Sequence, residues 1–125
     1  MPVEIPDNVR RFVLTSIPSV PHLEALLLMR SGSGKAWTAP ELARRLYVPE
    51  ARATGILRDF EQAGLVATEG NAGVRYAPTS DAEAVIGDLA EAYSKHLVAI
   101  TDLIHSADRR AIKFADAFRL NKEGN

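Results

Sequence analysis

Histidines and carboxylates are the side chains that catalysis or metal binding would need first. Histidine occurs at positions 22, 96 and 105, and the last two miss the i, i+4 spacing of a helical metal-binding pair. Asp102 lies three residues before His105, but this possible pair has no accompanying nucleophile. The chain has no cysteine, which excludes disulfides, thiolate nucleophiles and iron–sulfur clusters. We therefore expect no enzymatic activity, no cofactor and no metal site.

The Gly/Ser-rich segment 31–35 ends in Gly34-Lys35, as a phosphate-binding loop does. Such a loop needs a buried strand before it, and a Ser or Thr after the lysine to bind magnesium. Here Ala36 follows the lysine, and the residues before the loop have helical spacing. We therefore expect no nucleotide-phosphate site at this loop.

Arginine is the remaining residue type with a clear chemistry, because its guanidinium group binds phosphates and guanine edges. The candidate DNA-binding residues lie within or near the segment 49–63: Arg44, Arg45, Arg52, Thr54, Arg58 and Arg75. Arg52, Thr54 and Arg58 share the helix face opposite its apolar residues. The structural alternative is a solvated helix face with local ion pairs, such as Arg58 with Glu61.

The overall charge excludes a polybasic nucleic-acid coat. Fifteen Lys and Arg stand against sixteen Asp and Glu, which gives a formal net charge of −1. Residues 1–80 carry nine basic against eight acidic side chains, and the remainder carries six against eight. With 125 residues, 46% of them hydrophobic and 25% charged, the chain is typical of one globular domain with a core of its own.

The first half of the chain must position these arginines, and its helix signals are clear. Pro6-Asp7 predicts the start of a short helix that Pro18 ends, and Ser19 can cap a second helix that runs to about Ser31. Thr38 to Glu41 forms a capping box for a helix that ends at Leu46. A turn at residues 47–49 leads to a helix from Pro49 to about Ala63, which Gly64 ends.

Two β-prone runs, 65–68 and 74–77, flank a turn-forming sequence and predict a hairpin. Trp37, just before the capping box, is typical of a core residue or of a short strand that pairs with the hairpin. The expected fold is therefore mainly α-helical with a small β-hairpin.

The order helix, tight turn, helix, hairpin is that of a winged helix-turn-helix. The sequences TAPELARRLYVPE (38–50) and LRDFEQAGLV (57–66) closely resemble the core of bacterial winged-helix transcription regulators of the MarR-like and PadR-like groups. The resemblance covers about residues 20–78. It implies a second helix that enters the major groove of DNA, a hairpin that touches the backbone or minor groove, and added C-terminal helices for dimerisation.

Two positions depart from the family pattern. Tyr47 stands where the turn often carries glycine, so we expect a strained backbone there. Val48-Pro49 replaces the usual Ser or Thr cap of the second helix, a residue that often also contacts a phosphate.

From Asp81 to about residue 105 the sequence predicts one long amphipathic helix. Its apolar stripe is the predicted dimer interface: Val85, Leu89, Tyr93, Leu97, Ile100 and Ile104. An alternative, compatible with the first, is that the stripe packs on the N-terminal helix through Phe12, Val13 and Ile17. A further helix with Phe114 and Phe118 is expected up to Leu120.

We thus expect a winged helix-turn-helix domain with its N-terminal helix over residues 1–80, dimerisation helices over 81–120 and a polar tail over 121–125. The favoured function is a DNA-binding transcriptional regulator that acts as a homodimer on double-stranded DNA. The alternative is a winged-helix protein-protein interaction module. No signal peptide and no membrane-length apolar run is present, so we expect a cytoplasmic protein without a membrane partner.

Overall fold

The two N-terminal helices begin and end where the sequence predicted. The computed structural model describes residues 4–106, in which α1 spans Asp7–Ser16 and α2 spans Val20–Ser31. The Ser19 hydroxyl accepts the backbone N–H of His22 at 3.3 Å and so caps α2. Both helices turn their apolar faces inward, so that Val9, Val13 and Leu26 are fully buried.

The helix-turn-helix consists of α3 (Ala39–Leu46) and α4 (Glu50–Gln62). The Thr38 hydroxyl accepts the Glu41 backbone N–H at 3.4 Å, as the capping box predicts. The Glu41 carboxylate also accepts from the Thr38 hydroxyl at 3.2 Å and pairs with Lys35 at 3.0 Å. The hydrogen bond from Lys35 lowers the pKa of Glu41 below its ordinary value.

The turn between α3 and α4 contains the backbone strain that the sequence predicted. Tyr47 has φ 58° and ψ 45°, in the left-handed region that glycine adopts most easily. This conformation lets the Val48 N–H donate to the Ala43 carbonyl at 3.1 Å and close the end of α3. Pro49 precedes α4 without a side-chain cap.

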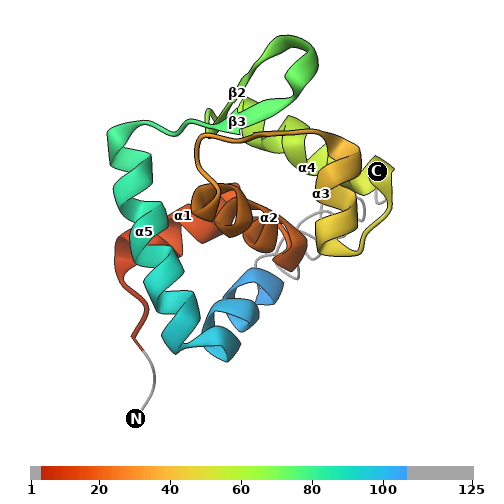
Figure 1. Cartoon of the computed structure of the whole chain (residues 1–125). Coiled ribbons are helices and arrows are strands. Elements are labelled where there is room, and N and C mark those ends of the chain that lie inside the picture. The colour runs from red at the N-terminus through yellow and green to blue at the C-terminus, as the bar shows by residue number, and fades with distance from the viewer. Residues whose placement is uncertain (1–3, 107–125) are drawn as a thin grey trace, which may run out of the picture.

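β2 and β3 form the wing, a hairpin that projects from one end of the molecule (Figure 1); with β1 they make a three-stranded antiparallel sheet in the order β1-β3-β2. β2 (Val66–Thr68) and β3 (Val74–Tyr76) form the predicted hairpin around a 3-10 turn at Gly70–Ala72. β1 (Ala36–Trp37) pairs with β3, and Trp37 stands opposite Val74. Trp37 is 3% exposed, so it is both a core residue and part of a strand.

The backbone of Gly73, in the wing hairpin, lies very close to the backbone of β1. A Cβ at this position would lie 2.1 Å from the Trp37 carbonyl oxygen, and its φ of 114° is one that side chains rarely adopt. We expect Gly73→Ala to lower the free energy of unfolding by roughly 2–4 kcal/mol, measured by urea denaturation. Gly70→Ala is the matched control, because its φ is also positive but nothing lies within 4 Å of the added Cβ. An equal loss in the two variants would contradict the close approach.

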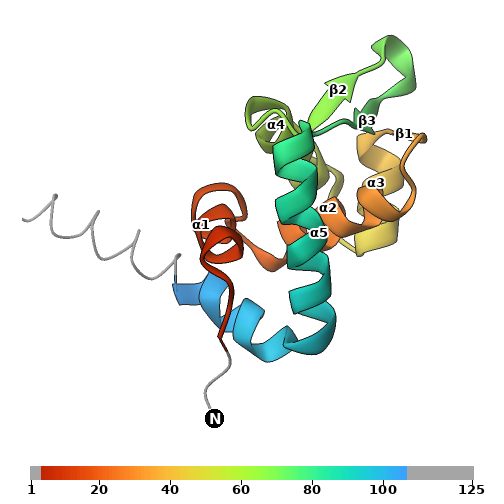
Figure 2. The same ribbon diagram turned by 90° about the vertical axis from the view of Figure 1, so that its left-hand side faces the viewer.

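The prediction of one continuous helix from Asp81 to residue 105 is wrong. α5 spans Ser80–Lys95, the chain leaves helical geometry at His96, and a second helix spans Leu97–Ser106. After the break the chain turns back beneath α1 and α2 (Figures 1 and 2). This turn lets Ile100 and Ile104 reach the core, whereas a straight helix would have carried them into solvent.

The apolar stripe of the C-terminal helices is largely covered by the chain itself. Ile86, Leu89, Ile100 and Ile104 are fully buried in the same core cluster as Val13 of α1. This confirms the alternative in which the stripe packs on the N-terminal helix. Two neighbouring apolar side chains stay in solvent, Leu97 at 54% and Val98 at 69% exposure.

The division of the chain after residue 80 stays a prediction, and the helices on both sides of it share one core. The predicted helix with Phe114 and Phe118 and the polar tail lie outside the described residues. Within residues 4–106 no single helix is long and apolar enough to cross a membrane; α1 and α2 meet that description only as a pair, with a bend of 112° between them.

Candidate nucleic-acid interface

The outer face of α4 carries the predicted recognition residues. Ala53, Ile56 and Phe60 are buried and hold the helix against the core. Arg52, Thr54 and Arg58 are exposed on the other side of the helix. The Thr54 hydroxyl donates to the Glu50 backbone carbonyl at 3.0 Å, which leaves its oxygen and methyl group facing solvent.

The local ion pair between Arg58 and Glu61, which the sequence allowed, does not form. Among the described residues neither Arg52 nor Arg58 has a carboxylate within ion-pair distance. Asp59, the neighbour of Arg58 on α4, pairs instead with His22. Within residues 4–106 the two guanidinium groups of α4 are therefore free of ion pairs.

Asp59 fixes α4 to the start of α2 through His22. His22 Nε2 lies 2.8 Å from Asp59 Oδ2, and its Nδ1 hydrogen-bonds the Ser19 hydroxyl. His22 is 9% exposed, and its imidazole meets the Phe60 ring edge-on, with 5.9 Å between the ring centres. The sequence did not predict the contact between His22 and Asp59, because 37 residues separate them. The only available signal was the spacing of Ser19 and His22, which allows a hydrogen bond between these two side chains.

α3 adds a second pair of cations beside α4. Arg44 and Arg45 lie exposed in its last turn and, within residues 4–106, pair with no carboxylate. The Arg45 guanidinium lies 5.8 Å from the centre of the Trp37 ring, over which Lys35 Nζ lies at 4.1 Å. The structure therefore places four of the predicted arginines on the helix-turn-helix unit.

Arg75, the predicted wing residue, is held by a neighbour on its own hairpin. Its guanidinium lies 2.8 Å from Glu69 Oε1, and Arg75 stands opposite Ala36 and Ala67 in the sheet. Sequence reasoning counted Glu69 only as part of the turn. The pair neutralises the wing, so the wing has no free cation in the described structure.

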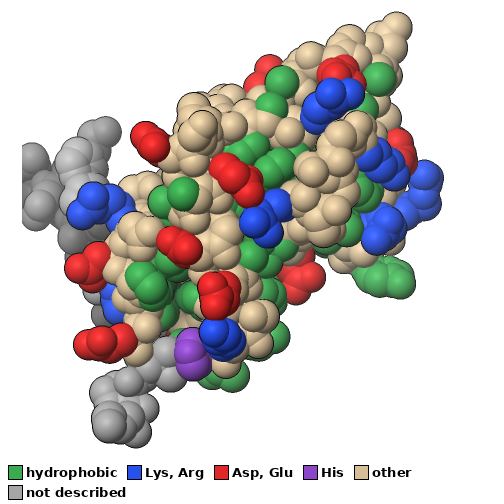
Figure 3. Space-filling model, turned by 60° about the vertical axis from the view of Figure 1, so that its left-hand side comes forward, with side chains coloured by type: hydrophobic (Ala, Val, Ile, Leu, Met, Phe, Trp, Pro, Cys, Tyr) green, Lys and Arg blue, Asp and Glu red, His purple; other side chains and the backbone are tan. Residues whose placement is uncertain are grey.

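On the face shown in Figure 3, several Lys and Arg side chains gather at the end that carries the wing, whereas over the rest of this face basic and acidic side chains are mixed. A near-neutral chain can therefore present a locally basic end to a polyanion.

A half-buried polar contact connects the wing to α5, and the sequence did not reveal it. The Tyr76 hydroxyl donates to Glu83 Oε2, and Arg30 Nε donates to Glu83 Oε1 at 3.0 Å. Burial and the nearby Glu83 carboxylate raise the pKa of Tyr76 well above its ordinary value. Three elements, α2, β3 and α5, meet at this one carboxylate.

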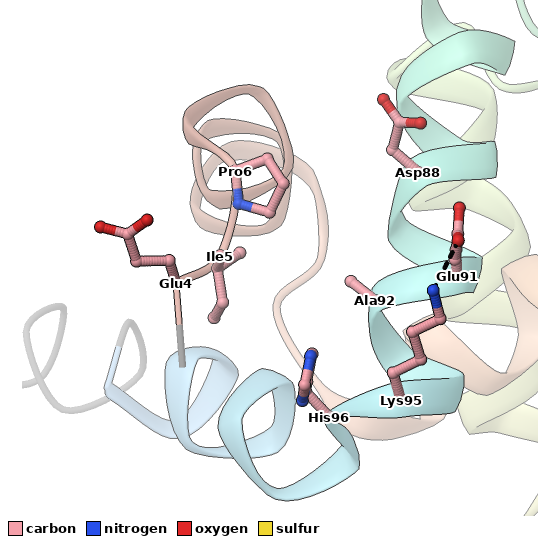
Figure 4. A pocket seen from close by; sticks show the side chains of 8 residues that line it. All are labelled: Glu4, Ile5, Pro6, Asp88, Glu91, Ala92, Lys95 and His96. Carbon is pink, nitrogen blue, oxygen red and sulfur yellow. Dashed lines mark hydrogen bonds and ion pairs between the residues drawn. The ribbon is translucent and has the colours of Figure 1, made fainter. Parts of the chain in front are cut away.

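A hollow of about 340 Å³ lies between the N-terminal segment and α5 (Figure 4). Its lining residues are Glu4, Ile5, Pro6, Asp88, Glu91, Ala92, Lys95 and His96. Glu91 pairs with Lys95 at 2.8 Å, and Asp88 accepts from Asn8 at 3.2 Å. No group of three His, Asp or Glu side chains in residues 4–106 is arranged to hold a metal ion.

Two solved structures are similar to this chain over most of its length. One is a MarR family transcription regulator, with 23% identity and a TM-score of 0.52 over 93% of this chain and 80% of that one. The other is a MarR family protein from Bacillus stearothermophilus, with 26% identity and a TM-score of 0.50 over 91% and 81%. This chain has a MarR-like winged-helix fold.

The MarR-like fold confirms the predicted fold class: mainly α-helical, with a β-hairpin wing that follows a helix-turn-helix. No family model matches the sequence. No curated protein matches it either. In this MarR-like chain α4 is the second helix of the helix-turn-helix, and β2 and β3 form the wing.

Proposed function

We propose that this protein is a DNA-binding transcription regulator that acts as a homodimer in the cytoplasm. The observation that carries the proposal is the outer face of α4: a MarR-like fold presents Arg52 and Arg58 there, exposed and without an ion-pair partner in the described structure. A structural neighbour of this fold is a transcription regulator, which supports the same function and argues against an enzyme.

In the proposed complex α4 lies in the major groove. Arg52 and Arg58 reach guanine edges or phosphates, and Thr54 contacts a phosphate or a thymine methyl group. Arg44 and Arg45 on α3 contact the backbone, because the first helix of this motif crosses it. Arg75 approaches the backbone or minor groove once Glu69 releases it.

A two-fold dimer would place two copies of α4 on the half-sites of a palindrome. Of the predicted interface residues, Leu97 is exposed and Val85 and Tyr93 are half-buried, so these three can contact a second copy directly. Leu89, Ile100 and Ile104 are buried in the core of the chain. We propose that they support the interface by packing its helices against that core.

The proposal is tested by titrating the protein against labelled duplex DNA at low salt and repeating the titration as salt is raised. The logarithm of the binding constant should fall with the logarithm of salt concentration, with a slope of about −0.9 for each phosphate contacted. Selection from a random duplex pool then gives the operator. Binding that stays unmeasurable at low salt would overturn the proposal.

Glu69 is expected to restrain DNA binding by the wing. Glu69→Gln removes the carboxylate that holds Arg75 and removes one negative charge that would face phosphates. We expect the affinity at low salt to rise about three- to tenfold and the salt dependence to steepen by about 0.9. Glu4→Gln makes the same change of charge away from the wing and should leave the affinity unchanged. Equal effects of the two substitutions would show that only total charge matters.

The second candidate function is a winged-helix module that binds a protein. The Arg75–Glu69 pair favours it, because a wing without a free cation gains little from DNA. The DNA titration separates the two functions, since a protein-binding module would show no salt-dependent affinity for duplex DNA.

A further inference from the structure

The turn between α3 and α4 presents a tyrosine that folding does not explain. Tyr47 is 94% exposed, and its hydroxyl makes no hydrogen bond within residues 4–106. The other two tyrosines are half-buried and donate to carboxylates, Tyr76 to Glu83 and Tyr93 to Glu24. Tyr47 thus gives the described structure neither packing nor a hydrogen bond.

The backbone at this position also favours a different residue. With φ 58° and ψ 45°, Tyr47 adopts a left-handed conformation in which a Cβ lies close to the following carbonyl oxygen. Glycine has no such conflict and is the usual residue at the end of a helix that closes in this way. A strained, fully exposed aromatic side chain is therefore a sign of a contact outside the chain.

The surroundings of Tyr47 favour a polyanion as the partner. Arg44 and Arg45 precede it in the last turn of α3, and Arg52 follows in the first turn of α4, all exposed. Glu50 is the acidic residue closest in sequence. In a helix-turn-helix the first helix crosses the DNA backbone and the second enters the groove, so the turn between them lies at the phosphates.

We propose that Tyr47 contacts the DNA backbone, with its hydroxyl donating to a phosphate oxygen and its ring packing on the adjacent deoxyribose. The inference rests on the proposed DNA-binding function and adds a residue to that site. α4 begins at Glu50, and its N-cap residue Pro49 has no hydroxyl, so the N-cap itself offers no side-chain donor to a phosphate. The contact sets the depth and register of α4 in the groove and carries no sequence information itself.

The test separates folding from binding, because Tyr47→Gly should move them in opposite directions. Relief of strain is expected to raise the melting temperature by about 3–6 °C, while the affinity for DNA falls by about thirtyfold. Tyr47→Phe keeps the ring and the strain, and should lose about tenfold in affinity with little change in melting temperature. Both losses should be the same on the selected operator and on random duplex, since phosphates are common to both.

Thr15→Val is the matched control, because it removes an exposed hydroxyl from α1, away from α3 and α4, and should leave the affinity unchanged. If the wild-type protein binds DNA and Tyr47→Gly binds equally well, the role of Tyr47 is overturned while the proposed function stands. If the wild-type protein fails to bind duplex DNA at low salt, both are overturned, and Tyr47 becomes a candidate contact for a protein partner.

Discussion

Replacing Arg52 and Arg58 together by alanine is expected to weaken binding to duplex DNA by at least about thirtyfold. Each arginine contributes roughly 1–3 kcal/mol when it reads a guanine edge, and less when it contacts only a phosphate. Neither side chain has an ion-pair partner within the described residues, so removing them leaves no carboxylate unpaired and should not disturb the fold. Fluorescence anisotropy over a salt series measures both the affinity and its slope.

The matched control for this double variant is Arg10→Ala with Arg11→Ala on α1. It removes the same two positive charges from exposed positions on a different helix. We expect a loss of less than about threefold, because charges away from the contacts act only through the screened overall field. Equal losses in the two double variants would mean that α4 is not the recognition helix.

Leu89→Ala is expected to impair folding and Leu97→Ala to impair dimerisation, although both residues belong to one sequence stripe. Leu89 is fully buried, so its truncation should lower the free energy of unfolding by about 3–5 kcal/mol. Leu97 is 54% exposed, so its truncation should cost the single chain less than about 1 kcal/mol and should weaken the dimer instead. Urea denaturation measures the first effect, and light scattering over a concentration series measures the second.

The wild-type protein should scatter as a species of twice 13.6 kDa at micromolar concentration, and Leu97→Ala should dissociate at higher concentration than the wild type. A wild-type mass of 13.6 kDa would contradict the proposed homodimer. If Leu97→Ala dimerises as tightly as the wild type, the dimer interface lies on another surface of the chain.

Most helix boundaries could be predicted because the signals that set them are local. Ser19 and Thr38 cap the helices that follow them by accepting N–H groups three residues away, as sequence patterns predict. Gly64 adopts a φ of 74° after α4, and Tyr47 takes the strained conformation expected of a side chain in place of glycine. Each of these interactions joins residues within one turn, so no knowledge of the fold is needed.

The break at His96 could not be predicted from periodicity. Apolar residues recur at helical spacing from Val85 to Ile104, and this pattern is the same in one helix as in two helices joined at an angle. The choice between them depends on where a core is available. α1 and α2 offer apolar surface beneath the end of α5, and burial of Ile100 and Ile104 there favours the bend.

Some features of the charges in the candidate site follow from the sequence, and others depend on the fold. The sequence by itself determined which residue types lie on the outer face of α4, because helical spacing and the positions of Ala53, Ile56 and Phe60 define that face. Only the tertiary structure decided which of those charges remain available. His22 engages Asp59 across 37 residues, which leaves Arg52 and Arg58 as the charges of this face that have no ion-pair partner from a distant segment of the described chain.

The balance of basic and acidic residues is thus a property of the sequence, whereas the basic end of the molecule is a property of the fold. The physical reason is the short range of hydrogen bonds and ion pairs, which act over a few ångströms. Sequence spacing predicts such neighbours only within a helix turn or across a tight hairpin. Contacts between distant segments depend on which faces the core brings together.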